Sequence, residues 1–208
     1  MKKILIDTNS INGRRSALIE GDKLIDFDLE FEGNNFQKGS IHKGKITKIE
    51  GSLEAIFVEM GSSRHGFLPF KELSGEYFDP SKTGEDRFKI SEGDDIVVQI
   101  QKEERVNKGA ALSTYISLAS RYIVLMTNHP NGGGISRRIH GEERDKIKSH
   151  IEALNVPENM SLIIRTAGID KQIEELRWDL EYLKKLWVEV ESAIKAVSYT
   201  HLTLPTNA

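Results

Sequence analysis

The sequence predicts a β-rich α+β fold. Two patterns carry this prediction: short apolar runs separated by turn signals fill the chain up to about residue 118, and an uninterrupted 3-4 spacing of apolar side chains covers residues 173–194. With 38% hydrophobic residues, 29% charged residues and 5 prolines among 208 residues, the composition is that of an ordered globular chain. We therefore expect strands first, helices last and a packed core.

Composition also excludes several classes of protein. The chain has no cysteine, which excludes a disulfide framework, a thiol nucleophile and a cysteine-based zinc site within these residues. No apolar run approaches the roughly 20 residues of a membrane-spanning helix, and only a short apolar run follows Lys3 before Asp7. We therefore expect a chain that is neither secreted nor inserted into a membrane.

Charge is distributed unevenly along a chain whose net charge is −3. Residues 36–49 and residues 105–141 contain no carboxylate, although both windows carry several Lys or Arg side chains. A basic window free of acidic groups is typical of a surface that meets a polyanion, but chance and solubility explain such clustering equally well. The charge pattern alone leaves both interpretations open.

The first 35 residues predict three short strands, with hairpin turn signals at Asn12-Gly13 and Gly21-Asp22. Three strands of this length cannot bury two faces by themselves, so they need a partner sheet from elsewhere. Gly33-Asn34-Asn35 then marks a boundary, and we treat residues 1–35 as a segment of their own.

Residues 36–119 predict a five-stranded Greek-key barrel of the OB type. Five short β patterns are interrupted once, by a stretch rich in Gly, Asp, Ser and Lys at residues 71–93. The patterns cover residues 41–49, 53–60, 66–69, 95–101 and 110–118.

Aromatic and basic side chains alternate in this barrel segment. Phe57, His65 and Phe67 are expected on adjacent strands of one sheet, with Lys43 and Lys45 near them. Aromatic rings stack on bases at about 1–3 kcal/mol per base and cations contact phosphates, so the pattern favours binding of single-stranded nucleic acid. In the alternative interpretation, the two phenylalanines belong to the barrel core, which is the commoner position for a lone phenylalanine.

Residues 120–196 predict a smaller α/β domain. A strand at 122–126, a helix at 141–154 and a strand at 161–164 precede a long amphipathic helix, whose apolar face must pack on something and most simply packs within the chain. Arg165 and Thr166 follow the second strand and offer a guanidinium fork and a hydroxyl, which suit a terminal phosphate. For Arg165 alone, a surface salt bridge is an equally good interpretation.

The final stretch, residues 197–208, breaks the helical pattern. It is rich in threonine and carries no formal charge. It resembles translated adapter sequence, so we predict a non-native tail and leave it out of the predicted fold.

Five motifs in order resemble the amino-terminal part of the ribonuclease E/G family, and the ribonuclease E branch more than the other. They are Ile41-His-Lys-Gly-Lys-Ile-Thr47, His65-Gly-Phe-Leu-Pro69, residues 102–119, Gly133-Gly-Ile-Ser-Arg-Arg-Ile139 and Ile164-Arg-Thr-Ala-Gly168. The barrel segment also resembles the RNA-binding domain that is repeated in the largest protein of the small ribosomal subunit. The family resemblance covers about residues 1–195, and the combined order of motifs makes it specific.

The resemblance implies a bacterial endoribonuclease that cleaves single-stranded RNA with a 5′-monophosphate end in rRNA and tRNA processing and in mRNA decay. It implies that residues 1–35 begin a ribonuclease H-like domain, into which an OB-fold RNA-binding barrel and a 5′-sensor domain are inserted. For the whole enzyme it implies a cytoplasmic homotetramer, in some members peripherally associated with the inner membrane, that uses Mg²⁺ and a structural Zn²⁺. We expect neither metal to be bound by the residues of this chain.

The resemblance also assigns roles in the 5′-sensor. Arg165 and Thr166 would bind the 5′-monophosphate, Val124 and the backbone of Ser120 would contact the terminal base, and Arg137 would support Arg165. Better-known members of the family have glycine at the position of Ser120, so the chain departs from the pattern there.

In the barrel, Phe57, Phe67 and Lys108 match the RNA-contacting positions of the family. We add His65 and Lys43 to this RNA-binding set because of their chemistry and their expected proximity to the aromatic rings.

We expect no catalytic residue within this chain. Metal-assisted RNA hydrolysis needs convergent carboxylates, which in the family come from a later domain. Asp7 is an isolated candidate for a metal ligand, whereas Asp26, Asp28, Glu30 and Glu32 alternate along a strand as a solvated face does. The chain would therefore bind RNA without cleaving it, and the alternative is a noncatalytic RNA-binding module associated with translation or RNA metabolism.

Overall fold

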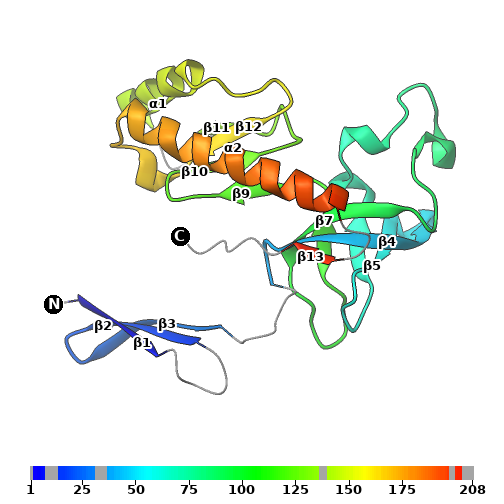
Figure 1. The fold of residues 1–208 in the computed structure, drawn as a ribbon, viewed down its shortest axis with the longest axis horizontal. Coiled ribbons are helices and arrows are strands. Elements are labelled where there is room, and N and C mark those ends of the chain that lie inside the picture. The colour runs from blue at the N-terminus through cyan, green and yellow to red at the C-terminus, as the bar shows by residue number, and fades with distance from the viewer. Residues whose placement is uncertain (1, 8–13, 31–36, 136–139, 197–199, 203–208) are drawn as a thin grey trace. The chain divides into compact units, whose positions relative to one another are not determined.

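The computed structural model of the chain describes residues 2–7, 14–30, 37–135, 140–196 and 200–202. It divides into two compact units, Met1–Asn35 and Phe36–Ala208, and each is described by itself (Figure 1). None of the helices in the described residues is long and apolar enough to cross a membrane.

The first unit is an antiparallel sheet of three strands in the order β1-β2-β3. The strands are β1 (Lys2–Asp7), β2 (Arg14–Glu20) and β3 (Lys23–Glu30). Three strands were predicted, and Gly21 takes the positive φ that the tight turn between β2 and β3 requires. Apolar side chains of this sheet stay exposed, Ile4 and Ile6 to 68% each. The sheet therefore does not bury its own apolar side chains, as expected for so few strands.

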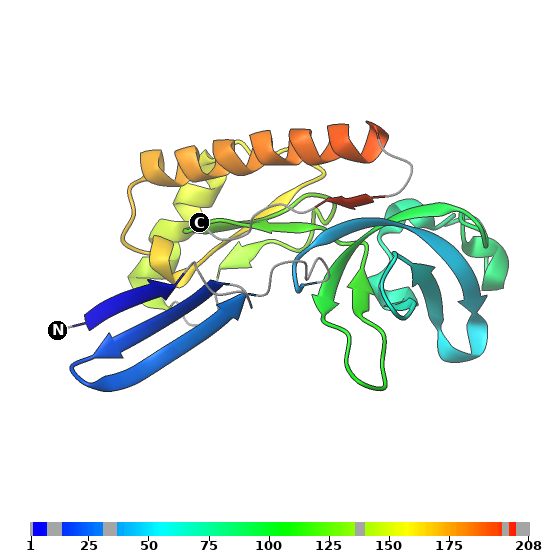
Figure 2. The same ribbon diagram turned by 60° about the horizontal axis from the view of Figure 1, so that its bottom comes forward.

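The second unit begins with a closed five-stranded barrel, which confirms that part of the predicted fold (Figure 2). The first strand, β4, pairs with β5 along its second half and with β7 along its first half, and this double pairing closes the barrel. The strands are β4 (Ile41–Glu50), β5 (Ala55–Glu59), β6 (Gly66–Pro69), β7 (Asp95–Lys102) and β8 (Ala111–Ser113).

Alternation along the barrel strands decides which side chains enter the core. On β5, Ile56 and Val58 are fully buried inside, so Phe57 between them points outward. Gly66 leaves room for the Leu112 side chain where β6 passes β8, because a Cβ on Gly66 would lie 2.4 Å from Cδ1 of Leu112. The long interruption predicted at 71–93 contains short 3₁₀ turns and an isolated bridge between Phe78 and Phe88, and its Leu73 and Ile90 belong to the barrel core.

A four-stranded sheet in the order β11-β12-β10-β9 and two helices complete the second unit. The elements are β9 (Ser117–Ala119), β10 (Ile123–Met126), β11 (Gly134–Ile135), α1 (Gly141–Ala153), β12 (Ser161–Ile164) and α2 (Ile173–Ala196). The predicted apolar face of α2 packs on this sheet and buries Leu176, Leu180, Leu183 and Val190 (Figure 1). Intramolecular packing of the long helix is thereby confirmed.

One strand boundary was predicted wrongly. The pattern at 110–118 is not a single barrel strand, because β8 ends at Ser113 and β9 starts a different sheet at Ser117. Polar side chains redirect the backbone there: Ile116 N donates to Oδ1 of Asn128 at 3.0 Å, and Ser117 N donates to Oε1 of Gln99 at 2.9 Å.

Part of the predicted non-native tail joins the barrel. Strand β13 (Thr200–Leu202) pairs antiparallel with the first half of β4, along Ile41–Lys43. Such pairing uses backbone groups, which any sequence offers, so the non-native origin of residues 197–208 stays a prediction.

Candidate nucleic-acid interface

The aromatic pair predicted in the barrel lies on its outer surface. Phe57 and Phe67 are register partners on β5 and β6, and their ring centroids are 6.0 Å apart in an edge-to-face arrangement. Both rings are half-buried and neither packs against the barrel core. The pair is therefore placed as a stacking surface would be, outside the core that the alternative interpretation assigned to it.

His65 stands next to this pair. Its Nδ1 lies 3.1 Å from Oγ1 of Thr47, and the same hydroxyl donates to the carbonyl of Phe57 at 3.1 Å. Thr47 thus ties the exposed imidazole of His65 to the strand that carries one ring.

Lys108 reaches the same region from a hairpin. The backbone of Lys108 exchanges two hydrogen bonds with Arg105, at 2.9 and 3.0 Å, and its side chain is exposed. The returning strand pairs with the ring-bearing strand, since Phe67 N donates to the carbonyl of Ala110 at 2.8 Å. Gly109 permits this close approach, because a Cβ there would lie 2.0 Å from the carbonyl oxygen of His65.

Lys43 lies elsewhere. Its Nζ is 3.4 Å from the carboxylate of Asp95 and 3.4 Å from the carbonyl oxygen of Ile194 at the end of α2. The half-buried ammonium therefore bridges the barrel to the helix. The structure does not bring Lys43 to the aromatic pair, and its assignment to RNA binding stays a prediction.

The exposed lysine nearest to the pair along β4 already has a partner. Lys48 faces Phe57 in the strand register, and its Nζ lies 2.7 Å from the carboxylate of Glu50. The hydrogen bond from Lys48 lowers the pKa of Glu50 to about 2, with a second contribution from Ser52. An acidic side chain thus stays ionised beside the surface throughout the physiological range.

A second cluster forms around Arg165, which directly follows β12. The Arg165 backbone N donates to the carbonyl of Tyr122 at 2.8 Å, and its Nη1 donates to the carbonyl of Ser120 at 2.5 Å. Arg165 and Thr166 are both exposed. Within the described residues no carboxylate lies in ion-pair distance of Arg165, so the predicted alternative of a salt bridge is not what the structure contains.

Helix α2 fixes the turn that holds Arg165. Oδ2 of Asp179 accepts hydrogen bonds from the Ser120 hydroxyl at 2.5 Å, from Tyr122 N at 2.9 Å and from Ile123 N at 3.0 Å. Sequence reasoning missed Asp179, although a carboxylate beside Leu176 and Leu180 on the apolar face of a helix was a usable signal.

Further cations surround the same turn. The guanidinium of Arg121 and Nζ of Lys171 each lie 5.3 Å from the ring centroid of Tyr122, within the range of cation–π attraction. The hydrogen bond from Lys171 to Glu175 is the main reason that the pKa of Lys171 is raised. Arg121, Lys171 and Arg165 thus bring three cations to this turn, of which Lys171 is ion-paired with Glu175 at 3.3 Å.

The remaining predicted site residues are placed as follows. Val124 is half-buried on β10, directly after the turn that Asp179 holds, and Arg137 lies outside the described residues. Asp7 faces Arg15 across the β1–β2 pair. No three His, Asp or Glu side chains come together as a metal site anywhere in the described part of the chain.

Comparison with known proteins gives two family matches and several relatives. A sequence model of the ribonuclease E/G family matches residues 117–206, and one of the S1 RNA binding domain matches residues 35–115. The chain is 48% identical over 200 residues to ribonuclease E of Escherichia coli K12, which covers 94% of the chain and 19% of that protein. It is 48% identical over 197 residues to ribonuclease E of Haemophilus influenzae, covering 93% and 21%.

Similarity to the ribonuclease G branch is lower. Ribonuclease G of Haemophilus influenzae is 35% identical over 187 residues, covering 86% of the chain and 38% of that protein. The chain spans about a fifth of the length of the two ribonuclease E relatives.

Proposed function

Because this chain belongs to the ribonuclease E/G family and joins a domain of that family to an S1 RNA-binding domain, we propose that it is the RNA-binding and 5′-end-sensing part of a bacterial endoribonuclease. The whole enzyme would cleave single-stranded RNA in rRNA and tRNA processing and in mRNA decay. The observation that carries the 5′-sensing part of this proposal is Arg165, an exposed guanidinium anchored by one N–H group and paired with no carboxylate in the described residues.

A 5′-monophosphate is the ligand that this arrangement favours. The contact between Nη1 and the Ser120 carbonyl orients the guanidinium plane and leaves its other N–H groups available for a two-pronged contact with phosphate oxygens. Thr166 supplies a hydroxyl donor next to it. A 5′-hydroxyl end has no charge for these donors, so we expect a preference of about 10- to 100-fold for the phosphorylated end, from hydrogen bonds worth about 1.5–3 kcal/mol.

The barrel surface would hold the body of the strand. Phe57 and Phe67 offer two ring faces or edges for successive bases, while Lys108 and His65 border them. Base stacking tolerates any sequence, so this surface would contribute affinity without strong base preference.

The test compares two single-stranded oligonucleotides that differ only in a 5′-monophosphate or a 5′-hydroxyl, using fluorescence anisotropy. The intact chain should bind the phosphorylated strand more tightly, and Arg165→Ala should remove the difference while leaving the affinity for the hydroxyl strand unchanged. Arg177→Ala is the matched control, because this exposed arginine lies two residues from Asp179 along α2 and so on another face of the helix. Equal affinity of the intact chain for both ends would refute the 5′-sensor.

Catalysis belongs to the proposal only at the level of the whole protein. Mg²⁺, a structural Zn²⁺, a cytoplasmic homotetramer and peripheral attachment to the inner membrane are proposed for that protein on the family likeness alone. The described residues do not offer a cluster that fits either metal, so no step of the proposal passes through one.

A further inference from the structure

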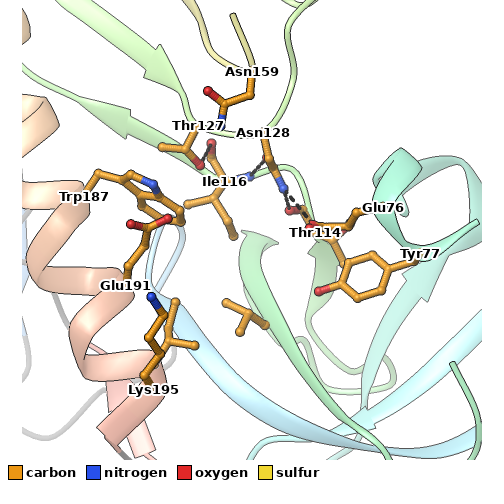
Figure 3. A pocket seen from close by; sticks show the side chains of 12 residues that line it. Glu76, Tyr77, Thr114, Ile116, Thr127, Asn128, Asn159, Trp187, Glu191 and Lys195 are labelled. Carbon is orange, nitrogen blue, oxygen red and sulfur yellow. Dashed lines mark hydrogen bonds between the residues drawn. The ribbon is translucent and has the colours of Figure 1, made fainter. Parts of the chain in front are cut away.

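A cavity of about 290 Å³ opens where the barrel meets the second half of α2 (Figure 3). Its lining includes three aliphatic side chains, Val97, Ile116 and Ile194, and two aromatic ones, Tyr77 and Trp187. Small-molecule sites in proteins start at about this volume and combine apolar walls with a few polar groups.

The inner wall of this cavity is fixed by internal hydrogen bonds. Asn128 uses both ends of its amide, accepting from Ile116 N at 3.0 Å and donating to the Thr114 carbonyl at 2.8 Å. The Thr127 hydroxyl donates to the Ile116 carbonyl at 3.3 Å. These groups have little hydrogen-bonding capacity left for a ligand. They therefore define the shape of the cavity and do not contribute to ligand recognition.

At the mouth of the cavity, in contrast to the inner wall, four side chains have no internal hydrogen-bond or ion-pair partner in the described residues. Trp187, Glu191 and Lys195 share one face of α2 at four-residue spacing and line the cavity, and Asn159 faces them from the loop before β12 (Figure 3). None of these four side chains makes a hydrogen bond or an ion pair within the described residues. Glu191 and Lys195 have the spacing of a helical ion pair and yet remain apart on the rim.

We propose that this cavity binds a guanine base, with its ring against the Trp187 indole and its N1–H and N2–H groups donating to the Glu191 carboxylate. Guanine presents two adjacent donors on its Watson–Crick edge, and a carboxylate accepts both at once. The amide of Asn159 can donate to O6, and Lys195 on the rim can contact the phosphate attached to the same nucleoside. Nucleobases in single-stranded RNA are read in this manner, by stacking and by hydrogen bonds to the Watson–Crick edge.

Other ligands fit the same groups less well. Adenine, cytosine and uracil do not present two adjacent donors to a carboxylate. An arginine or lysine side chain would suit Glu191 and the indole, but the ammonium of Lys195 would repel it. The site lies about 18 Å along α2 from Asp179, so it is distinct from the proposed 5′-end site and does not depend on it.

The fluorescence of Trp187 can report binding of the base in the cavity. The chain has two tryptophans, so Trp178→Phe leaves Trp187 as the single fluorescent indole. We expect GMP to quench it saturably and to bind about tenfold or more tightly than AMP, CMP or UMP. Glu191→Gln should reduce the affinity for GMP about tenfold, whereas Glu189→Gln, on the exposed side of the same helix, should leave it unchanged.

A second arm identifies the source of the base. Oligouridine strands with a 5′-hydroxyl end and a single guanine or adenine are titrated against the same chain, so that the 5′-phosphate site is not engaged. Quenching by the guanine strand alone assigns the cavity to RNA, and quenching by GMP alone assigns it to a free nucleotide. Equal quenching by all bases, no response to Glu191→Gln, or stronger quenching by arginine amide than by GMP would overturn the proposal.

Discussion

At the scale of single residues, Asp179 helps to orient Arg165, although Asp179 itself takes no part in the proposed phosphate contact. It accepts three hydrogen bonds from the turn at 120–123, and this turn supplies the carbonyl that orients Arg165. Asp179 is therefore a positioning residue for the proposed phosphate contact.

Replacing Asp179 should separate positioning from simple loss of structure. In Asp179→Asn, an amide replaces the carboxylate that accepts from the three donors of the turn at 120–123. We therefore expect the free energy of unfolding to fall by about 1–3 kcal/mol. We also expect the ratio of affinities for 5′-phosphate over 5′-hydroxyl RNA to fall about tenfold. Ser120→Gly keeps the backbone carbonyl and the two backbone donors, so its ratio should stay within about twofold of the intact chain. A partly unfolded variant would lose both affinities together, and an unchanged ratio in Asp179→Asn would contradict the positioning role.

The buried phenol of Tyr77 leads to a prediction about how the free energy of unfolding depends on pH. Burial raises the pKa of Tyr77 to about 12, so its neutral form stabilises the folded state fully below pH 10, the ordinary tyrosine pKa, and this contribution is lost as the pH rises from 10 to 12. At pH 11 the intact chain should have lost about 1.4 kcal/mol more of its free energy of unfolding than Tyr77→Phe has. Urea denaturation of both proteins at pH 8 and pH 11 measures this difference, and parallel losses would mean that the phenol is not buried in solution.

At the scale of elements, the hairpin that carries Lys108 is locked to the barrel through Gly109. A methyl group at this position would lie 2.0 Å from a backbone oxygen of His65, which cannot move aside as a side chain can. We expect Gly109→Ala to cost about 1–3 kcal/mol of stability and to weaken binding of 5′-hydroxyl RNA, because the hairpin and His65 must shift together. Gly75→Ala, where nothing lies within 4 Å, is the matched control and should bind as the intact chain does.

Elements with a clear period could be predicted from the sequence. The apolar spacing of α2 and four of the five strand patterns of the barrel each follow from one local signal, and these elements appear in the structure with nearly the predicted bounds. The break between β8 and β9 could not be predicted, because it depends on hydrogen bonds from Gln99 and Asn128, which are distant in sequence from the strand they divide. The role of Asp179 was missed for the same reason, since its partners lie more than 50 residues away.

At the scale of the whole second unit, the barrel surface and the Arg165 cluster are two separate groups of contacts on one chain. Phe57 and Phe67 belong to the barrel, whereas Arg165 belongs to the other sheet region, and within the described residues no hydrogen bond or ion pair joins the two groups directly. If one RNA strand occupies both, their contributions to the binding free energy should be nearly additive.

This additivity can be measured with strands of two lengths. On a long 5′-phosphorylated strand, Phe57→Ala with Phe67→Ala should weaken binding by about 1–3 kcal/mol per lost stack, and by the same factor for a 5′-hydroxyl strand, since stacking does not depend on the end group. Arg165→Ala should affect only the phosphorylated strand, and the triple variant should show the sum. On a strand of two or three nucleotides the preference for phosphate should persist while the phenylalanine effect disappears, because such a strand reaches only one site. A phenylalanine effect that depends on the 5′-phosphate would instead mean that the two groups of contacts act as a single site.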